Sequence, residues 1–193
     1  MNNFALRVFK YRSYTPIPFL ILMLVFEQAT PLSLIIGFLI ALLGEFFRFW
    51  GVAYAGSETR RTGEVGATYL VVSGAFAHLR NPLYLGNMLM YLGVGIMSMA
   101  LFPFLQIAAL VFFIWQYSVI IKEEEAFLVS KYGSAYEDYR ASVPKLIPRL
   151  KAFPNPGIEQ PPFNPTAGLK SEMRTLQAFA VIFVLIIVRY ALS

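Results

Sequence analysis

The chain contains no cysteine and a single histidine, His78. Without cysteine it has no disulfide, no thiolate nucleophile and no thiolate metal ligand. A single histidine also argues against a histidine-based metal centre. No metal site is therefore predicted.

Charge is also scarce. Only 14% of the 193 residues are charged and 58% are hydrophobic, and the mean hydropathy is +0.60. Soluble domains carry about 25% charged residues, so the composition indicates an integral membrane protein. The net charge is +5. Its basic residues flank apolar runs instead of forming one stripe, which points to membrane topology and away from a nucleic-acid partner.

Apolar runs predict an all-α protein with about five transmembrane helices. The runs cover residues 16–27, 32–55, two spans within 83–121 with a break near 98–103, and 176–192. The first is near the lower length limit for a span. It follows Arg7, Lys10 and Arg12, but no small-residue cleavage site comes after it, so it is predicted to stay as a span rather than act as a signal peptide. Gly86, Gly93 and Gly95 permit close contact within the hairpin of 83–121.

Polar segments connect these spans within a single membrane domain. Residues 56–81 form a loop with a short β-like run at 69–72. The fourth helix is predicted to continue past Lys122 to about residue 132, and Ser134 and Glu137 have the spacing of a capping box for a short helix over 134–142. Residues 1–55 hold the first two spans, 56–150 the loop, hairpin and short helices, 151–175 a Pro-rich connection, and 176–192 the last span.

The basic residues give an orientation. The N-terminus, residues 56–81 and residues 122–174 are basic, whereas the turns near Thr30 and at 98–103 carry no Lys or Arg. The positive-inside rule then places the N-terminus and both polar stretches in the cytoplasm. Small size and short loops favour a prokaryotic plasma membrane.

The first polar stretch that suggests a site is Arg80-Asn81-Pro82. Asn81 suits an N-cap with an acceptor side chain, and Pro82 suits the first helical position. The free N–H groups of such a turn bind anions, and Arg80 lies beside them. From Tyr84, helical spacing places Asn87, Met88 and Tyr91 on one stripe. These aromatic residues equally fit a packing role.

The second polar stretch follows the hairpin. Glu123, Glu124 and Glu125 point in three directions on a helix, so at least one should face the bundle. A solvated helix face is the alternative. The next short helix places three residues on one face, where they could close a pocket: Tyr136, Tyr139 and Arg140. Within the second span, Glu45 and Arg48 lie at i, i+3 and either neutralise each other or mark a functional site.

Together the two stretches resemble a known superfamily. The first half of the pattern is Gly66, Leu70-Val71, Gly74, Phe76, Arg80-Asn81-Pro82 and Tyr84. The second is Lys122-Glu123-Glu124-Glu125, Tyr132-Gly133, Tyr136 and Tyr139. Their order around a membrane hairpin, over residues 57–148, is similar to that of the isoprenylcysteine carboxyl methyltransferase and phospholipid methyltransferase superfamily.

The resemblance implies a membrane enzyme that uses S-adenosylmethionine, with its cofactor pocket on the cytoplasmic side between the loop before the third span and the segment after the fourth. Glu124 or Glu125 would bind the methionyl ammonium, and Phe76 and the backbone near Gly74 would lie by the adenosine. The implied cofactor-binding residues are Gly74, Phe76, His78, Arg80, Asn81, Tyr84, Glu124, Glu125 and Tyr136. The implied catalytic residues are Arg80, Asn81, Tyr84 and Arg140. His78 also fits a solvated or packing role.

The chain departs from the prenylcysteine branch at two positions. Asn81 replaces the histidine of the Arg-His-Pro motif, and Thr68 replaces a histidine that often precedes the Leu-Val pair. These departures leave the carboxyl-methylating specificity of that branch undecided for this chain. The methyl acceptor is expected to be a lipophilic small molecule or a lipid. Arg80 or Arg140 would orient a carboxylate, and Glu45 would serve as base for an amine or hydroxyl.

Two other functions fit parts of the sequence. Membrane sterol reductases have a similar C-terminal hairpin but use NADPH and need a larger basic pocket. A non-catalytic membrane module, such as a small transporter subunit, is the third possibility. Transporters often carry internal repeats, and no repeat is found in this chain.

Overall fold

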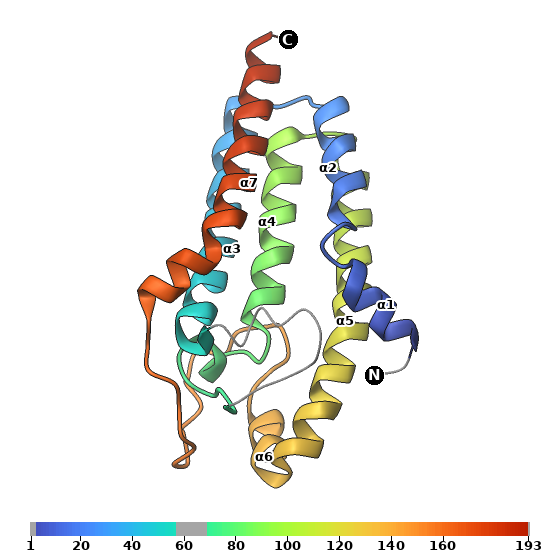
Figure 1. Ribbon diagram of the computed structural model, residues 1–193. Helices are drawn as coiled ribbons and strands as arrows, with labels where there is room; N and C mark the ends of the chain where they lie inside the picture. Colours follow the sequence, from blue (N-terminus) through green and yellow to red (C-terminus); the bar gives the residue numbers. More distant parts are fainter. Residues whose placement is uncertain (1–2, 57–68, 193) are drawn as a thin grey trace.

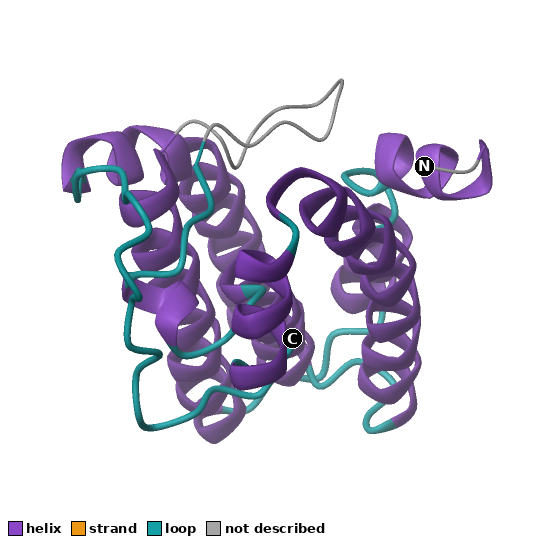
Figure 2. Ribbon diagram, turned by 90° about the horizontal axis from the view of Figure 1, so that it is seen from below, coloured by secondary structure: helices purple, strands orange, loops and turns teal. Residues whose placement is uncertain are grey.

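The computed structural model describes residues 3–56 and 69–192, and this part of the chain contains helices and no strand (Figure 2). The elements in chain order are α1 (Asn3–Tyr11), α2 (Pro16–Val25), α3 (Pro31–Ala55), the 3-10 helix η2 (Gly74–Ala77), α4 (Pro82–Ser98), α5 (Phe104–Tyr132), α6 (Ser134–Ser142) and α7 (Pro165–Leu192). The all-helical prediction is confirmed for the described residues.

Three of these helices, α3, α5 and α7, are long and apolar enough to cross a membrane. Helix α4 has 17 residues and α2 has 10, so at about 1.5 Å per residue they extend about 26 and 15 Å. A bilayer core is about 30 Å thick. The protein is therefore a helical membrane protein with three candidate spans among the described residues, and the five-span topology stays a prediction.

The long helices run side by side, so the segments that connect them lie at the two ends of the bundle (Figure 1). The α2–α3 turn meets the end of α4, where the Gln28 N–H donates to the Ser98 carbonyl over 2.8 Å. At the opposite end, α6 lies with η2 and the start of α4. The two polar stretches are thus at the same end of the bundle.

Glycines bring α3 and α4 into close contact. A Cβ on Gly37 would lie 2.4 Å from the Gly93 carbonyl oxygen, and one on Gly44 would lie 2.6 Å from that of Gly86. Small residues allow such backbone approach in membranes. The predicted close contact exists, but Gly86 and Gly93 face α3, and only Gly95 faces the hairpin partner α5, where Gln106 packs on it.

Gly93→Val tests this contact. The new side chain meets the α3 backbone, because even a Cβ would lie 2.5 Å from the Gly37 oxygen. We expect a loss of about 1–3 kcal/mol of stability, typical of overpacking, seen as a lower Tm in detergent. Ala180→Val, at an exposed α7 position, is the control. Equal Tm values for the two variants would contradict the packing.

One local prediction is confirmed and two are corrected. Helix α5 does continue to Tyr132 and ends at Gly133, whose φ is 54°. The predicted capping box is wrong, since Gly133 is the N-cap of α6 and no side chain caps that helix. The β-like run at 69–72 is not a strand. Its polar backbone is satisfied by Gln160, which accepts from the Val72 N–H (2.8 Å) and donates to the Leu70 carbonyl (2.9 Å).

The last helix begins earlier than predicted. Helix α7 starts at Pro165 instead of 176, because Asn164 caps it by accepting the Ala167 N–H over 2.9 Å. Its first turns are polar, which is why the sequence placed them in the connection. They carry Glu172, which is 1% exposed. Residues 151–164 are non-helical, as predicted for that part of the Pro-rich connection.

Candidate active site

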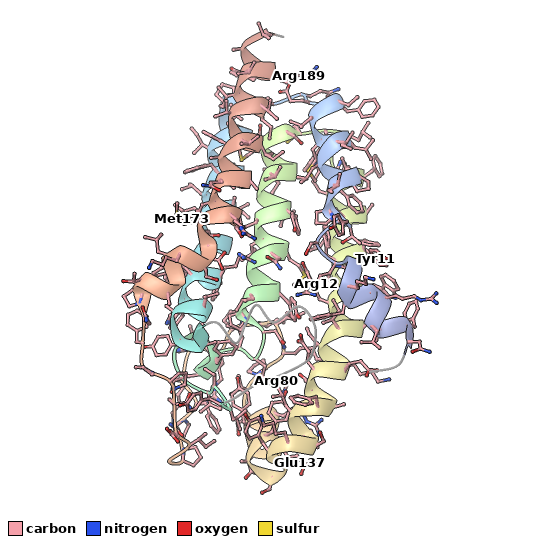
Figure 3. The ribbon with its side chains drawn as sticks, viewed as in Figure 1. Tyr11, Arg12, Arg80, Glu137, Met173 and Arg189 are labelled. Atoms are coloured by element: carbon pink, nitrogen blue, oxygen red, sulfur yellow. The ribbon has the colours of Figure 1, made fainter. Side chains whose placement is uncertain are left out.

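Arg80 holds the two polar stretches together. Its Nη1 donates to the carbonyls of Arg140 and Val143, the latter over 2.9 Å, and its Nη2 lies 3.0 Å from Glu125 Oε1. The Arg80 N–H also donates to the Pro144 carbonyl over 2.9 Å. The start of α4 is thereby tied to α5 and to the end of α6. Figure 3 shows Arg80 at this junction.

Tyr84 and Glu124 make a second link between the stretches. The Tyr84 hydroxyl donates to Glu124 Oε1 over 2.8 Å, and its ring stacks on Tyr117 with centroids 4.6 Å apart. Glu124 therefore faces the bundle, and Glu125 faces Arg80. The predicted inward orientation of at least one carboxylate is confirmed.

Asn81 has the predicted position but another role. It precedes α4, with Pro82 in the first turn, yet its side chain makes no capping bond. Its φ of −130° and ψ of 63° differ from the extended backbone usual for an N-cap, and its Nδ2 donates to the Lys145 carbonyl over 3.1 Å. The expectation of an acceptor side chain at the first turn is wrong. Asn81 instead joins α4 to the segment after α6.

Two buried tyrosines of α6 form the floor of this region. Tyr136 and Tyr139 are each 2% exposed, and the Tyr139 hydroxyl donates to the Phe76 carbonyl over 2.7 Å. Burial raises the pKa of both hydroxyls above the usual value, so both stay protonated donors. Arg140 is exposed, and the bond that it makes to Arg80 comes from its backbone.

Gly74 and His78 lie in and after η2. Gly74 has φ 61°, and a Cβ would lie 2.3 Å from the Tyr54 ring, so its backbone approaches that ring as only glycine permits. His78 Nδ1 lies 2.8 Å from the Arg149 carbonyl, and its ring lies 5.5 Å from that of Trp50. These contacts favour the packing role of His78. Gly66 and Thr68 of the motif lie outside the described residues.

Sequence reasoning did not find a buried polar cluster around Arg48. Arg48 is 9% exposed. Its Nε donates to Glu172 Oε2 over 3.0 Å and its Nη2 to Thr175 Oγ1 over 3.2 Å, and Nη1 donates to Asn87 Oδ1. The predicted Glu45–Arg48 pair exists at 3.6 Å. The signal for the larger cluster was Glu172, a lone carboxylate close before an apolar run.

Within the described residues, Arg80 Nε is buried without a hydrogen-bond partner, and Glu125 Oε1 is buried with only the ion-pair contact to Arg80 Nη2 at 3.0 Å. Buried polar groups are normally satisfied, so a bound ligand is one explanation for such a pair. One atom is a donor and the other an acceptor. They fit a ligand that carries both a carboxylate and an ammonium. No three His, Cys, Asp or Glu side chains of residues 3–56 and 69–192 are grouped to hold a metal ion.

Fold and site together define a helical membrane protein with a charged, aromatic site where α4, α5 and α6 meet at one end of the bundle. Residues 32–135, just over half of the chain, match the sequence profile of the phospholipid methyltransferase family. The chain belongs to this family, and the predicted superfamily is confirmed.

Curated relatives agree with the assignment. The chain is 38% identical over 82 residues to the protein-S-isoprenylcysteine O-methyltransferase of Schizosaccharomyces pombe (42% of this chain, 34% of that protein). It is 28% identical over 127 residues to the enzyme of that name from Saccharomyces cerevisiae (64% and 52%). It is 32% identical over 126 residues to the cobalt-zinc-cadmium resistance protein CzcN of Cupriavidus metallidurans (64% and 53%). The chain thus spans about half or less of these relatives. No solved structure matches it.

Proposed function

We propose that this protein transfers a methyl group from S-adenosylmethionine to a lipophilic acceptor in the membrane. The observation that carries the proposal is the meeting of Arg80, Tyr84, Glu124 and Glu125 at one end of a membrane bundle. Family membership supports the reaction class.

The residues present fit the cofactor. S-adenosylmethionine, when bound, supplies a methyl group on a sulfonium that is electrophilic without further activation. Glu125 Oε1 already lies 3.0 Å from Arg80 Nη2 and, as a carboxylate oxygen, can accept a second donor such as the cofactor ammonium, whereas Arg80 Nε is a buried donor for the cofactor carboxylate. Glu124 adds a second carboxylate, whose direction is set by the Tyr84 hydroxyl. Gly74 and Phe76 would lie beside the adenosine.

Catalysis would then come from positioning and exclusion of water. Methyl transfer by direct displacement needs alignment of acceptor and donor more than covalent help from the protein. The Tyr84 hydroxyl contacts Glu124 and the Tyr84 ring stacks on Tyr117, so a polar ligand at that carboxylate would lie against aromatic surface and be removed from bulk water. Asn81 has no contact in this arrangement that suits a proton transfer, and its proposed role is to hold Lys145 against α4.

The acceptor is proposed to enter from the bilayer. A groove of about 550 Å³ lies in the surface of α3 beside α7. Its lining residues are Leu39, Leu42, Leu43, Glu45, Phe46, Phe49 and Leu176. Hydrocarbon chains fit such a lining, and Glu45 is its ionisable member. Glu45 is the proposed base for an amine or hydroxyl acceptor, and exposed Arg140 is the proposed partner of a carboxylate.

The orientation in the membrane is part of the proposal. The end that carries the site also carries Arg140, Lys145, Arg149 and Lys151, and cytoplasmic loops are enriched in such residues. The site and the N-terminus are therefore placed on the cytoplasmic side of a prokaryotic plasma membrane, where S-adenosylmethionine is available.

A comparison of two cofactors separates the proposal from the reductase alternative. We expect S-adenosylhomocysteine to raise the Tm of the purified protein and NADPH to leave it unchanged, because a ligand stabilises only the state that binds it. Adenosine serves as the control for binding of the base alone. Protection by NADPH and not by S-adenosylhomocysteine would favour the reductase. Protection by neither would favour the non-catalytic module.

A further inference from the structure

The basic N-terminal segment forms a helix that packs on the bundle. Helix α1 buries Ala5 and Phe9 and exposes Arg7 and Lys10. Phe4 meets Trp115 of α5 edge-on, with ring centroids 6.3 Å apart. Figure 1 shows α1 lying across α5. The segment therefore does more than supply positive charge for topology.

Phe9 connects α1 to the aromatic wall of the candidate site. It belongs to a buried cluster with Met88, Ala109, Phe113, Tyr117, Ile120 and Ile121, and Tyr84 packs against that cluster. Tyr84 and Tyr117 are the rings that carry the link to Glu124. A side chain that packs on Phe9 is therefore held in a defined position relative to the Glu124 carboxylate.

Arg12 is fixed in this way. Its Cζ lies 3.7 Å from the centre of the Phe9 ring, and its Nη1 donates to the Phe9 carbonyl over 2.7 Å. Thr15 Oγ1 donates to the Arg12 carbonyl over 2.9 Å. A stacked guanidinium is held at a defined place, so it loses little further freedom when it binds a ligand.

The Arg12 charge acts on the candidate site. It interacts electrostatically with Glu124, Tyr84 and Tyr117, and Figure 3 shows it on the side of α1 nearer to α4. Both terminal nitrogens of Arg80 are engaged, with Glu125 and with two backbone carbonyls. Arg12 is a further cation beside the site, with a guanidinium fork whose shape matches carboxylate and phosphate.

We propose that Arg12 binds an oxyanion, a carboxylate or a phosphate, of a ligand in the candidate site, which makes α1 part of the binding site. The inference rests on the proposed function. Two sources share this chemistry: the carboxylate of the cofactor and an anionic head group of the lipophilic acceptor. Arg12→Gln removes the charge, and Arg12→Lys keeps the charge but not the fork. Arg7→Gln makes the same charge change at an exposed position of the same helix.

The cofactor arm compares two ligands by calorimetry. S-adenosylhomocysteine carries the carboxylate, and 5′-methylthioadenosine lacks the whole amino-acid part. If the oxyanion comes from the cofactor, Arg12→Gln weakens S-adenosylhomocysteine binding about tenfold or more and leaves methylthioadenosine binding unchanged, as loss of a charge-assisted bidentate contact predicts. Arg12→Lys lies between, and Arg7→Gln matches the wild type.

The acceptor arm measures the Tm shift by oleate and by oleyl alcohol in mixed micelles. If the oxyanion comes from the acceptor, protection of the wild type by oleate exceeds that by the alcohol, and Arg12→Gln loses this excess. This arm needs no cofactor. If the wild type fails to bind S-adenosylhomocysteine, the proposed function fails and the oleate comparison alone decides the role of Arg12.

A role limited to balancing Glu124 predicts the opposite sign. Without Arg12 the carboxylate attracts the ammonium of S-adenosylhomocysteine more strongly, so binding by Arg12→Gln would be equal or tighter. Equal or tighter binding together with an unchanged oleate effect overturns the proposal. Equal weakening of methylthioadenosine and of oleyl alcohol also overturns it, because that pattern reports a collapsed site.

Discussion

Arg48→Met is expected to lower the free energy of unfolding by about 3–5 kcal/mol, the cost typical of removing one partner from a buried ion pair. The guanidinium joins Glu172 and Thr175 of α7 to Asn87 of α4. Without it, the buried Glu172 carboxylate, 1% exposed, loses its contacts with the Arg48 guanidinium. Tm and unfolding by denaturant in detergent measure the effect.

The double variant Arg48→Met with Glu172→Met separates charge from packing. It removes both charges, so we expect it to be more stable than Arg48→Met alone. Arg189→Met removes an exposed arginine of α7 and should change the Tm little. The charge pairing would be contradicted if Arg48→Met and Arg189→Met gave the same Tm, or if the double variant lost as much stability as Arg48→Met and Glu172→Met lose together when each is measured alone.

Glu125→Gln and Glu124→Gln are each expected to weaken binding of S-adenosylhomocysteine about 10- to 100-fold. A hydrogen bond to a charged group contributes about 1.5–3 kcal/mol, and both carboxylates are held inside the site, by Arg80 and by Tyr84. Calorimetry on the purified protein measures the dissociation constants.

Glu137→Gln is the matched control, because Glu137 lies exposed on α6 (Figure 3). Tyr84→Phe removes the bond to Glu124 without changing charge, and a smaller loss, about 1 kcal/mol, is expected. Tm values for each variant show whether the Arg80 link still holds the fold. Wild-type affinity in both glutamine variants at unchanged Tm would exclude the two carboxylates from the cofactor site.

Local chemistry explains which parts of the structure were predictable. The onset of charge at Lys122 within a helical pattern, followed by Gly133, predicted where α5 leaves the apolar bundle and where it ends. Those signals are local in sequence. The joining of the two polar stretches was also predictable, because a hairpin returns the chain to the end at which it started.

The errors have a common physical origin in long-range pairing. A lone carboxylate such as Glu172 is normally expected outside the membrane. Arg48, on another helix, compensates its charge and so allows it to be buried. Residues 69–72 have a β-like composition, but their backbone is paired by the distant Gln160 side chain instead of by a strand. From the sequence, Arg12 is assigned only to membrane topology. The packing of Phe9, on which Arg12 stacks, against Tyr117 and Tyr84 is a contact between distant parts of the chain and has no local signal.

Methyl transfer itself is the most direct test of the proposed function. The purified protein in nanodiscs made from bacterial lipid extract is incubated with S-adenosylmethionine labelled in its methyl group, and the organic extract is counted. We expect label in the lipid fraction with wild type and with Glu137→Gln, and a strong loss with Glu125→Gln. Tight S-adenosylhomocysteine binding with no labelled lipid would contradict the proposed class of acceptor, and label unaffected by Glu125→Gln would contradict the proposed site.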